Sequence, residues 1–373
     1  MYPALAIAEA IRANAKASQP THTAALPAAE LFFVGSMDGF ERPLVEASGV
    51  TFDRYDEVRS GPLHGVGLPK ALVSAAQIIA GTAQAVGLIR RYQPKALLLT
   101  GGWVGVPVAL AAWLLRVPAL IFLPDIEPGL TIRVLKTIAQ RVAITVPDSS
   151  VYFRDGQTVV TGYPVRQDVQ DAAKPDSRAE ALAHFGLDPA LKTLMVFGGS
   201  RGARSINLAL LDILPDLLSE DLQIIHVTGT LDWPDVEARR NTFADQTALA
   251  RYHAYPYLHN DMGLALAAAD LVVSRAGASI LGEFPLFGVP SILIPYPYAW
   301  RYQKVNADYL ADRDAAIRMD DERMKDELLP TIRRLLADPA RLSQMGHNAA
   351  ALAQPASAGR VATELLRLAG ENV

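Results

Sequence analysis

Residues 198–204, in the second half of the sequence, have the residue types needed to hold an anion. They read Gly-Gly-Ser-Arg-Gly-Ala-Arg and stand between a predicted strand and a predicted helix. Glycines let the backbone turn tightly and approach a ligand, and the first amides of a helix can bind an anion. The segment lacks the Gly-Lys-Ser/Thr of a Walker motif and the full dinucleotide-binding spacing. A glycine turn without a ligand is the alternative interpretation.

A second segment, residues 274–279, reads Ser-Arg-Ala-Gly-Ala-Ser and is followed by Glu283. Glu283 comes about one helical turn after Ser279, so its carboxylate is expected to face the same side as the segment. A carboxylate that accepts hydrogen bonds from two vicinal hydroxyls is a common way to hold a ribose. The alternative is an exposed helical glutamate, but residues 284–287, which follow it, are all apolar.

A third segment, residues 295–303, combines aromatic side chains with an amide. Tyr296, Tyr298 and Trp300 offer ring faces, and Gln303 offers amide hydrogen bonds. Sugars are bound by this pairing of stacking and amide contacts. Because two prolines make the segment rigid, a purely structural turn is the alternative.

In the first half of the sequence, Asp125 and Glu127 are the acids best placed to act as a general base. Both follow a predicted strand and precede a Pro-Gly turn. For Glu127, the alternative role is compensation of a helix dipole. Residues 100–107 form another glycine-rich connection between a strand and a helix.

A parallel sheet must position these segments, because short apolar runs alternate with helical patterns along nearly the whole chain. Strands are expected at residues 31–34, 96–100, 119–123, 142–146, 193–197, 223–227, 271–274 and 291–295. The pattern restarts after the hydrophilic residues 167–177, which we interpret as a linker. The sequence therefore predicts an α/β protein with two doubly wound domains, residues 1–166 and 178–350, and ligands beyond the carboxyl ends of the strands. Residues 351–373 are expected to form a terminal helix that packs on one of the two.

Composition excludes several classes of protein. A chain of 373 residues exceeds what one core usually organises, which supports two domains. The formal net charge of −4 gives no electrostatic reason to expect a nucleic-acid partner. The sequence has no cysteine, which excludes disulfides and thiolate metal sites.

The longest uncharged run, residues 71–89, has the length of a membrane span. Its polar residues, among them Ser74, Gln77 and Gln84, are unfavourable in lipid. Apolar residues recur along it at spacings of three and four: Leu72, Ala76, Ile79, Ala83 and Val86. This periodicity predicts an amphipathic helix with that stripe packed against the core. Contact with a membrane surface is the less favoured alternative.

The sequence is helical in pattern from its first residues, with Pro3 suited to a first helical turn. A doubly wound domain normally enters its first helix from a strand and a tight loop. We therefore expect a truncation or a misassigned start, with that strand and loop missing from this sequence.

Taken together, these segments resemble glycosyltransferase family 28, and most closely its members that build peptidoglycan. The likeness runs nearly end to end and covers residues 3–8, 101–107, 128–131, 162–166, 198–204, 207, 267–270, 274–278, 283 and 303–307. The combination of residues 198–204, 274–278 and Glu283 is specific to this family.

The resemblance implies a GT-B fold, in which two Rossmann-like domains face a cleft, and an inverting reaction without metal or cofactor. It implies transfer of N-acetylglucosamine from UDP-GlcNAc to the 4-hydroxyl of undecaprenyl-pyrophosphoryl-MurNAc-pentapeptide. Such an enzyme is expected to be peripheral, on the cytoplasmic face of the inner membrane. The implied donor site consists of Arg166 near the nucleotide, Gly198, Gly199 and Ser200 at the diphosphate, Leu258 and His259 at uracil, Ala278, Ser279 and Ile280 along the phosphates, Glu283 at the ribose, and Gln303 at the sugar.

The sequence departs from the family pattern in two places. The family's amino-terminal glycine-rich loop ends in a histidine just before the position of Met1, so both are absent here. Where the family has His-Glu-Gln-Asn, residues 122–125 read Phe-Leu-Pro-Asp, which places Asp125 at the asparagine position and makes it our candidate base. The departures leave three alternatives: a UDP-sugar transferase with another acceptor, a nucleotide-sugar-binding protein without turnover, and a nucleotide-sugar 2-epimerase.

Overall fold

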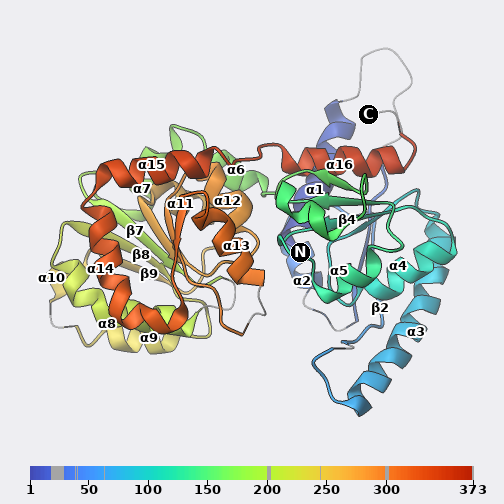
Figure 1. Cartoon of the computed structure of the whole chain (residues 1–373), viewed down its shortest axis with the longest axis horizontal. Coiled ribbons are helices and arrows are strands. Elements are labelled where there is room, and N and C mark those ends of the chain that lie inside the picture. Colours follow the sequence, from blue (N-terminus) through green and yellow to red (C-terminus); the bar gives the residue numbers. More distant parts are fainter. Residues whose placement is uncertain are drawn as a thin grey trace. The chain divides into compact units, whose positions relative to one another are not determined.

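The computed structural model describes residues 1–17, 29–37, 39, 41–62, 64–199, 203–243, 245–298 and 302–371. They divide into two compact units (Figure 1). Unit 1 comprises Met1–Arg166 together with Ala356–Val373, and unit 2 comprises Gln167–Pro355. All strand pairings in the described part of the chain are parallel, as the continuous apolar runs predicted.

Unit 2 is built around a six-stranded sheet with the order β12-β11-β10-β7-β8-β9. Its strands are β7 (Lys192–Phe197), β8 (Leu222–Val227), β9 (Tyr252–Tyr255), β10 (Leu271–Ser274), β11 (Ser291–Leu293) and β12 (Ala316–Arg318). The first strand, β7, lies in the middle, and the order runs outward from it in both directions. The adjacent strands β7 and β10 therefore form a topological switch point, where a doubly wound sheet opens a crevice for a ligand.

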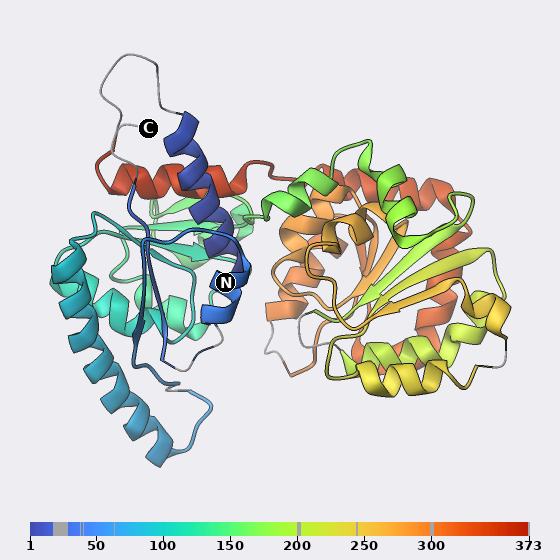
Figure 2. The same cartoon turned by 180° about the vertical axis from the view of Figure 1, so that it is seen from behind.

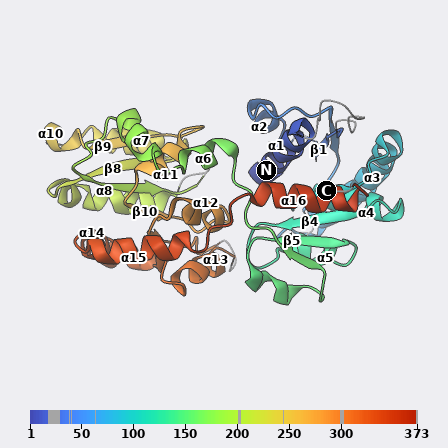
Figure 3. The ribbon, with the colours of Figure 1, turned by 90° about the horizontal axis from the view of Figure 1, so that it is seen from above.

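Helices cover both faces of this sheet. They are α6 (Gln167–Ala172), α7 (Ser177–Phe185), α8 (Arg204–Leu218), α9 (Trp233–Arg240), α10 (Gln246–Leu249), α11 (Met262–Ala268), α12 (Ile280–Phe287), α13 (Tyr302–Ala311), α14 (Met324–Leu336) and α15 (Pro339–Ala350), with a short 3-10 helix η2 (Asp321–Arg323). Strand residues such as Val196 form one buried cluster with Leu210 of α8 and Leu328 of α14. Figure 3 shows α14 and α15 on one side of the strands and α7 and α11 on the other.

Unit 1 contains a four-stranded sheet of order β3-β4-β5-β6 and a two-stranded sheet, β1-β2. Its elements are α1 (Tyr2–Ala17), β1 (Phe32–Ser36), α2 (Glu41–Ala47), β2 (Arg54–Val58), α3 (Leu68–Tyr92), β3 (Leu97–Leu99), α4 (Gly105–Leu114), β4 (Ala119–Leu123), α5 (Leu130–Leu135), β5 (Arg141–Ile144), the 3-10 helix η1 (Pro147–Tyr152), β6 (Thr158–Val160) and α16 (Ser357–Leu368). The terminal helix α16 packs on α1 and β4. Its Arg360 donates two hydrogen bonds, of 3.0 and 2.7 Å, to the carbonyl oxygen of Thr161.

The interpretation of residues 167–177 as a linker was wrong for its first half, which forms α6. Val169 and Ala172 of α6 are buried, and α6 packs on α11. Gly263 of α11 makes this close approach possible, because a Cβ there would lie 2.8 Å from the Cβ of Ala172. The segment looked like a linker because only these two of its apolar residues face the core, while the surrounding residues are hydrophilic.

The helix expected in the uncharged run is present as α3, but the face predicted to be buried was wrong. The buried residues of α3 are Ser74, Ile78, Gly81 and Ala85. Small residues line this face because the helix passes close to its neighbours: a Cβ on Gly81 would lie 1.9 Å from the carbonyl oxygen of Arg59. Leu72 and Ile79, from the predicted stripe, are each 72% exposed. By length and composition alone, α3 could cross a membrane; Figure 2 shows its first turns extending away from the rest of unit 1.

Candidate active site

Three predicted segments begin at neighbouring strand ends in unit 2. In the sheet register, Ser274 at the end of β10 pairs with Phe197 of β7 on one side and with Leu293 of β11 on the other. Because parallel strands end at the same edge, the loops after these strands lie side by side at the switch point. The structure thus brings together the two glycine-containing segments and the third, proline-rich segment.

Of the loop after β7, the structure describes Gly198, Gly199 and Ala203. Gly199 is exposed and has a φ of +90°, a conformation that other residues rarely adopt. Helix α8 begins at Arg204 without a side-chain cap on its first amides. Ser200, the predicted diphosphate ligand, lies outside the described residues. Gly198 is half-buried and stands directly at the end of β7.

Arg275, directly after β10, ties the three loops together and is buried. Its Nη1 donates to Oδ1 of Asp321 at 2.5 Å and to the carbonyl oxygen of Ile294 at 3.1 Å, after β11. Its Nη2 donates to Oγ of Ser205 at 2.7 Å, in the first turn of α8. Its guanidinium also lies 5.3 Å from the ring centre of Tyr296. One cation therefore connects the loops after β10 and β11 with the first turn of α8 and with η2.

The helix after this loop, α12, carries Glu283 in its first turn. The backbone amide of Glu283 donates to the carbonyl oxygen of Ser279 at 2.8 Å, and the residue is half-buried. Ala278 and Ser279 are also half-buried at this edge. Ile280, by contrast, is only 2% exposed, so its side chain belongs to the core and only its backbone remains for a ligand.

Gln303 lies in the first turn of α13, and its side-chain amide has a defined orientation. The backbone N–H of Tyr296 donates to Oε1 of Gln303 at 2.9 Å. Since Oε1 is engaged there, Nε2 is the end of the amide that can donate to a sugar oxygen. Three residues later, Asn306 donates through Nδ2 to the carbonyl oxygen of Ala276 at 3.2 Å, which links α13 to the loop after β10. Trp300 lies outside the described residues.

Leu258 and His259 follow β9, at the same sheet edge but two strands away from β7. Leu258 is buried and His259 is exposed, with its ring edge-on to Tyr257 at 4.6 Å between ring centres. The contact of this segment with uracil stays a prediction.

The remaining predicted site residues, Asp125 and Arg166, belong to unit 1. Asp125 is half-buried in the bend after β4, next to carbonyls that accept hydrogen bonds from Oγ1 of Thr145. Glu127 is buried and pairs with Arg133 of α5 at 2.5 Å, so this acid fastens the turn. The guanidinium of Arg166 lies 4.9 Å from the ring centre of Tyr2.

Sequence reasoning gave Arg275 and Asn306 no individual role. The signal for Arg275 was available, because a charged residue directly after an apolar strand requires buried partners. In the described part of the chain, no group of three or more His, Asp or Glu side chains could hold a metal ion.

Comparison with known proteins gives near full-length matches. The family models described as glycosyltransferase family 28 N-terminal domain and C-terminal domain match residues 1–144 and 193–361. A UDP-N-acetylglucosamine–N-acetylmuramyl-(pentapeptide) pyrophosphoryl-undecaprenol N-acetylglucosamine transferase of Roseiflexus sp. (strain RS-1) is 38% identical over 414 aligned positions, covering 97% of this chain and 91% of the relative. A protein of the same name from Desulforudis audaxviator (strain MP104C) is 33% identical, with coverage of 100% and 96%.

Solved structures share the fold. The crystal structure of Acinetobacter baumannii MurG has a TM-score of 0.72 at 23% identity and covers 98% of this chain and 95% of its own. A structure of S. aureus MnaA with UDP has a TM-score of 0.67 at 12% identity, with coverage of 100% and 96%. At these identities the likeness concerns the fold alone, and it confirms the predicted pair of Rossmann-like domains.

Proposed function

The chain belongs to glycosyltransferase family 28, and we propose that it transfers N-acetylglucosamine from UDP-GlcNAc to undecaprenyl-pyrophosphoryl-MurNAc-pentapeptide. In this reaction the acceptor's 4-hydroxyl oxygen bonds to C1 of the sugar with inversion. The bond from C1 to the β-phosphate oxygen breaks, the hydroxyl proton passes to a base, and UDP leaves. The names of relatives at 33–38% identity support the donor and the acceptor.

The observation that carries the proposal is the set of loops at the switch point of unit 2. In the proposed complex, Glu283 accepts hydrogen bonds from ribose hydroxyls. Gly198, Gly199 and the first turn of α8 are the proposed contacts of the diphosphate. Because departing UDP gains negative charge, a helix amino terminus fixed before the reaction stabilises the transition state. Nε2 of Gln303 is the proposed donor to the sugar.

A direct assay tests the acceptor. Labelled UDP-GlcNAc is incubated with the lipid-linked MurNAc-pentapeptide, using the chain as printed and a version extended upstream of Met1. We expect a labelled disaccharide lipid. UDP binding without transfer by either version would reject this acceptor and favour another one. Formation of UDP-ManNAc from UDP-GlcNAc alone would instead favour an epimerase.

Asp125 of unit 1 is the proposed general base. Replacing it by asparagine, the family's residue at this position, is expected to lower kcat by about 100-fold, the lower end of general-base effects. UDP affinity should not change, because Asp125 is proposed to act on the acceptor's hydroxyl and not on the nucleotide. Steady-state kinetics and calorimetry measure the two quantities. The exposed Asp155→Asn of the same unit is the matched control, and full activity of Asp125→Asn would exclude this base.

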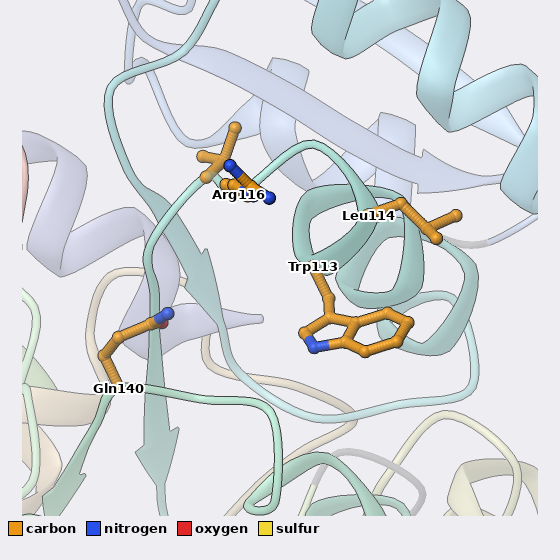
Figure 4. Close-up of a pocket in the computed structure, with 5 residues that line it drawn as sticks. Trp113, Leu114, Arg116 and Gln140 are labelled. Carbon is orange, nitrogen blue, oxygen red and sulfur yellow. The ribbon is translucent and has the colours of Figure 1, made fainter.

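We further propose that α3 holds unit 1 against the cytoplasmic surface of the cell membrane. Its exposed apolar residues include Leu68, Leu72, Val73 and Ile79. Exposed cations, Lys70, Arg90 and Arg91, stand near both of its ends. Such a combination of apolar surface and positive charge suits a membrane with anionic lipids. Helix α4, which packs on α3, ends with Trp113 and Leu114, both more than half exposed (Figure 4).

The change Leu72→Glu tests this membrane contact. Burial of one leucine is worth about 1.5 kcal/mol or more, so we expect binding to phosphatidylglycerol-containing vesicles to fall by about tenfold. Leu231→Glu in unit 2 is a matched control, because Leu231 is 74% exposed and Leu72 is 72% exposed. Cosedimentation with vesicles measures both variants. Equal losses for the two changes would contradict the assignment to α3.

A further inference from the structure

A chain of hydrogen bonds crosses the interior of unit 2 from β9 to the first turn of α8. The hydroxyl of Tyr252 lies 2.6 Å from Nδ1 of His226, on β8. Nε2 of His226 lies 2.9 Å from Oδ1 of Asn207, on α8. Nδ2 of Asn207 donates to Oδ2 of Asp232 at 2.9 Å and to the carbonyl oxygen of Thr228 at 2.8 Å. Tyr252, His226, Asn207 and Asp232 are all buried.

The partners of Asn207 determine where every proton in this chain lies. A backbone carbonyl and a carboxylate can only accept, so the group that faces them must be the NH₂ of Asn207. Its Oδ1 therefore faces His226 and must receive a proton from Nε2. The imidazole is neutral, because burial lowers the pKa of His226 to about 3. Nδ1 then has only a lone pair, which accepts the hydroxyl proton of Tyr252.

The far end of the chain lies at the start of α8. The backbone N–H of Asn207 donates to the carbonyl oxygen of Ala203 at 2.9 Å, so Asn207 belongs to the first turn of α8. Oδ1 of Asp232 accepts from Nη1 of Arg204, the first residue of α8, at 3.3 Å. Arg204 and Asn207 are thus held in the first turn of α8, which follows the loop that begins with Gly198 and Gly199.

We propose that His226, as the Nε2–H tautomer, is a positioning residue for the donor's diphosphate, acting through Asn207 on the first turn of α8. The role rests on the proposed function, since it assumes that this turn binds the diphosphate. His226 itself lies in the core and does not touch the ligand. Its N–H fixes the amide of Asn207, and that amide joins the first turn of α8 to the loop after β8.

Two replacements of His226 distinguish the effect of its N–H donor from the effect of the ring's volume. His226→Gln can present an amide N–H near the position of Nε2, whereas His226→Leu fills similar space without a donor. We expect His226→Leu to raise the Kd for UDP and the KM for UDP-GlcNAc by about tenfold, with kcat at saturating donor nearly unchanged. His226→Gln should restore most of the affinity. Calorimetry with UDP and steady-state kinetics measure these effects.

The change Leu214→Ala provides a control for general destabilisation. Leu214 is fully buried on α8, nearly two turns beyond Asn207. This variant should lower the midpoint of urea unfolding but retain the wild-type Kd for UDP. Wild-type affinity in His226→Leu would overturn the inference, and so would an equal loss in Leu214→Ala. Failure of the unchanged chain to bind UDP would instead reject the proposed function.

Imidazole nitrogen NMR of the unchanged chain tests the network without any variant. Long-range proton–nitrogen correlations distinguish a protonated Nε2 from a protonated Nδ1. We expect His226 as the Nε2–H tautomer, with no change in protonation between pH 8 and 5. A protonated Nδ1 would contradict the deduced tautomer of His226 and overturn the proposal, even if the variants did not fold.

Discussion

Replacing Glu283 by alanine is expected to weaken UDP binding by about 100-fold, the largest loss of affinity that we predict from a single change. Each hydrogen bond to a charged group contributes about 1.5 kcal/mol or more, so loss of two ribose contacts corresponds to about 3 kcal/mol. Calorimetry with UDP measures the loss. The same variant should bind uridine more weakly by a similar factor, because the ribose is present in both ligands.

A matched carboxylate distinguishes the ribose contact from the overall charge of unit 2. Glu237 is exposed on α9 of the same unit, and Glu237→Ala should bind UDP with the wild-type Kd. Glu283→Gln keeps one acceptor oxygen, so its Kd for UDP should lie between the values of Glu283→Ala and the wild type. Unchanged affinity in Glu283→Ala would remove the residue from the proposed donor site and leave the family membership intact.

The second large effect is expected at Arg275. Replacement by methionine leaves the Asp321 carboxylate, the carbonyl of Ile294 and the hydroxyl of Ser205 without their common donor. Breaking a buried ion pair by removing one partner costs about 3 kcal/mol. We therefore expect a loss of this size in the free energy of unfolding, measured in urea, together with much weaker UDP binding because three site loops lose their shared anchor.

Arg178, on α7, offers a control at the other end of β10. It donates to the carbonyl oxygen of Ala268 at 2.9 Å and to Oδ2 of Asp270 at 3.0 Å, just before β10 begins. Arg178→Met therefore removes a similar set of bonds at the opposite edge of the sheet. It should lower stability and leave the Kd for UDP unchanged. If both variants lose UDP affinity in proportion to stability, Arg275 has no special role at the site.

The continuous apolar runs were enough to predict the central strands. Leu271–Ser274 and Ala119–Leu123 were predicted with the bounds observed for β10 and β4. The strands that were missed lie mostly at sheet edges or are short. β2 reads Arg-Tyr-Asp-Glu-Val, and β12 has three residues. Such strands have little apolar signal, because an edge strand needs fewer buried side chains.

The glycine-containing loops were predictable because the residues that give them their chemistry are adjacent in the sequence. The hydrogen-bond network that holds these loops was not predictable in this way. Arg275 bonds to Asp321 and Ser205, which are 46 and 70 positions away in the chain. The prediction of the buried face of α3 was wrong for a related reason. A neighbouring backbone approaches the helix closely at Gly81, and this favours small residues over large apolar ones on the buried face.

The division of the chain has a consequence for synthesis on the ribosome. Domains usually fold in the order in which they emerge. Here unit 2, residues 167–355, emerges before unit 1 has its last element, α16. Until α16 is translated, the surfaces of α1 and β4 on which it packs stay uncovered, and the carbonyl of Thr161 lacks the hydrogen bond from Arg360. The half of the protein that is translated first is therefore completed last, and a premature stop after residue 355 would leave it unfinished beside a fully translated unit 2.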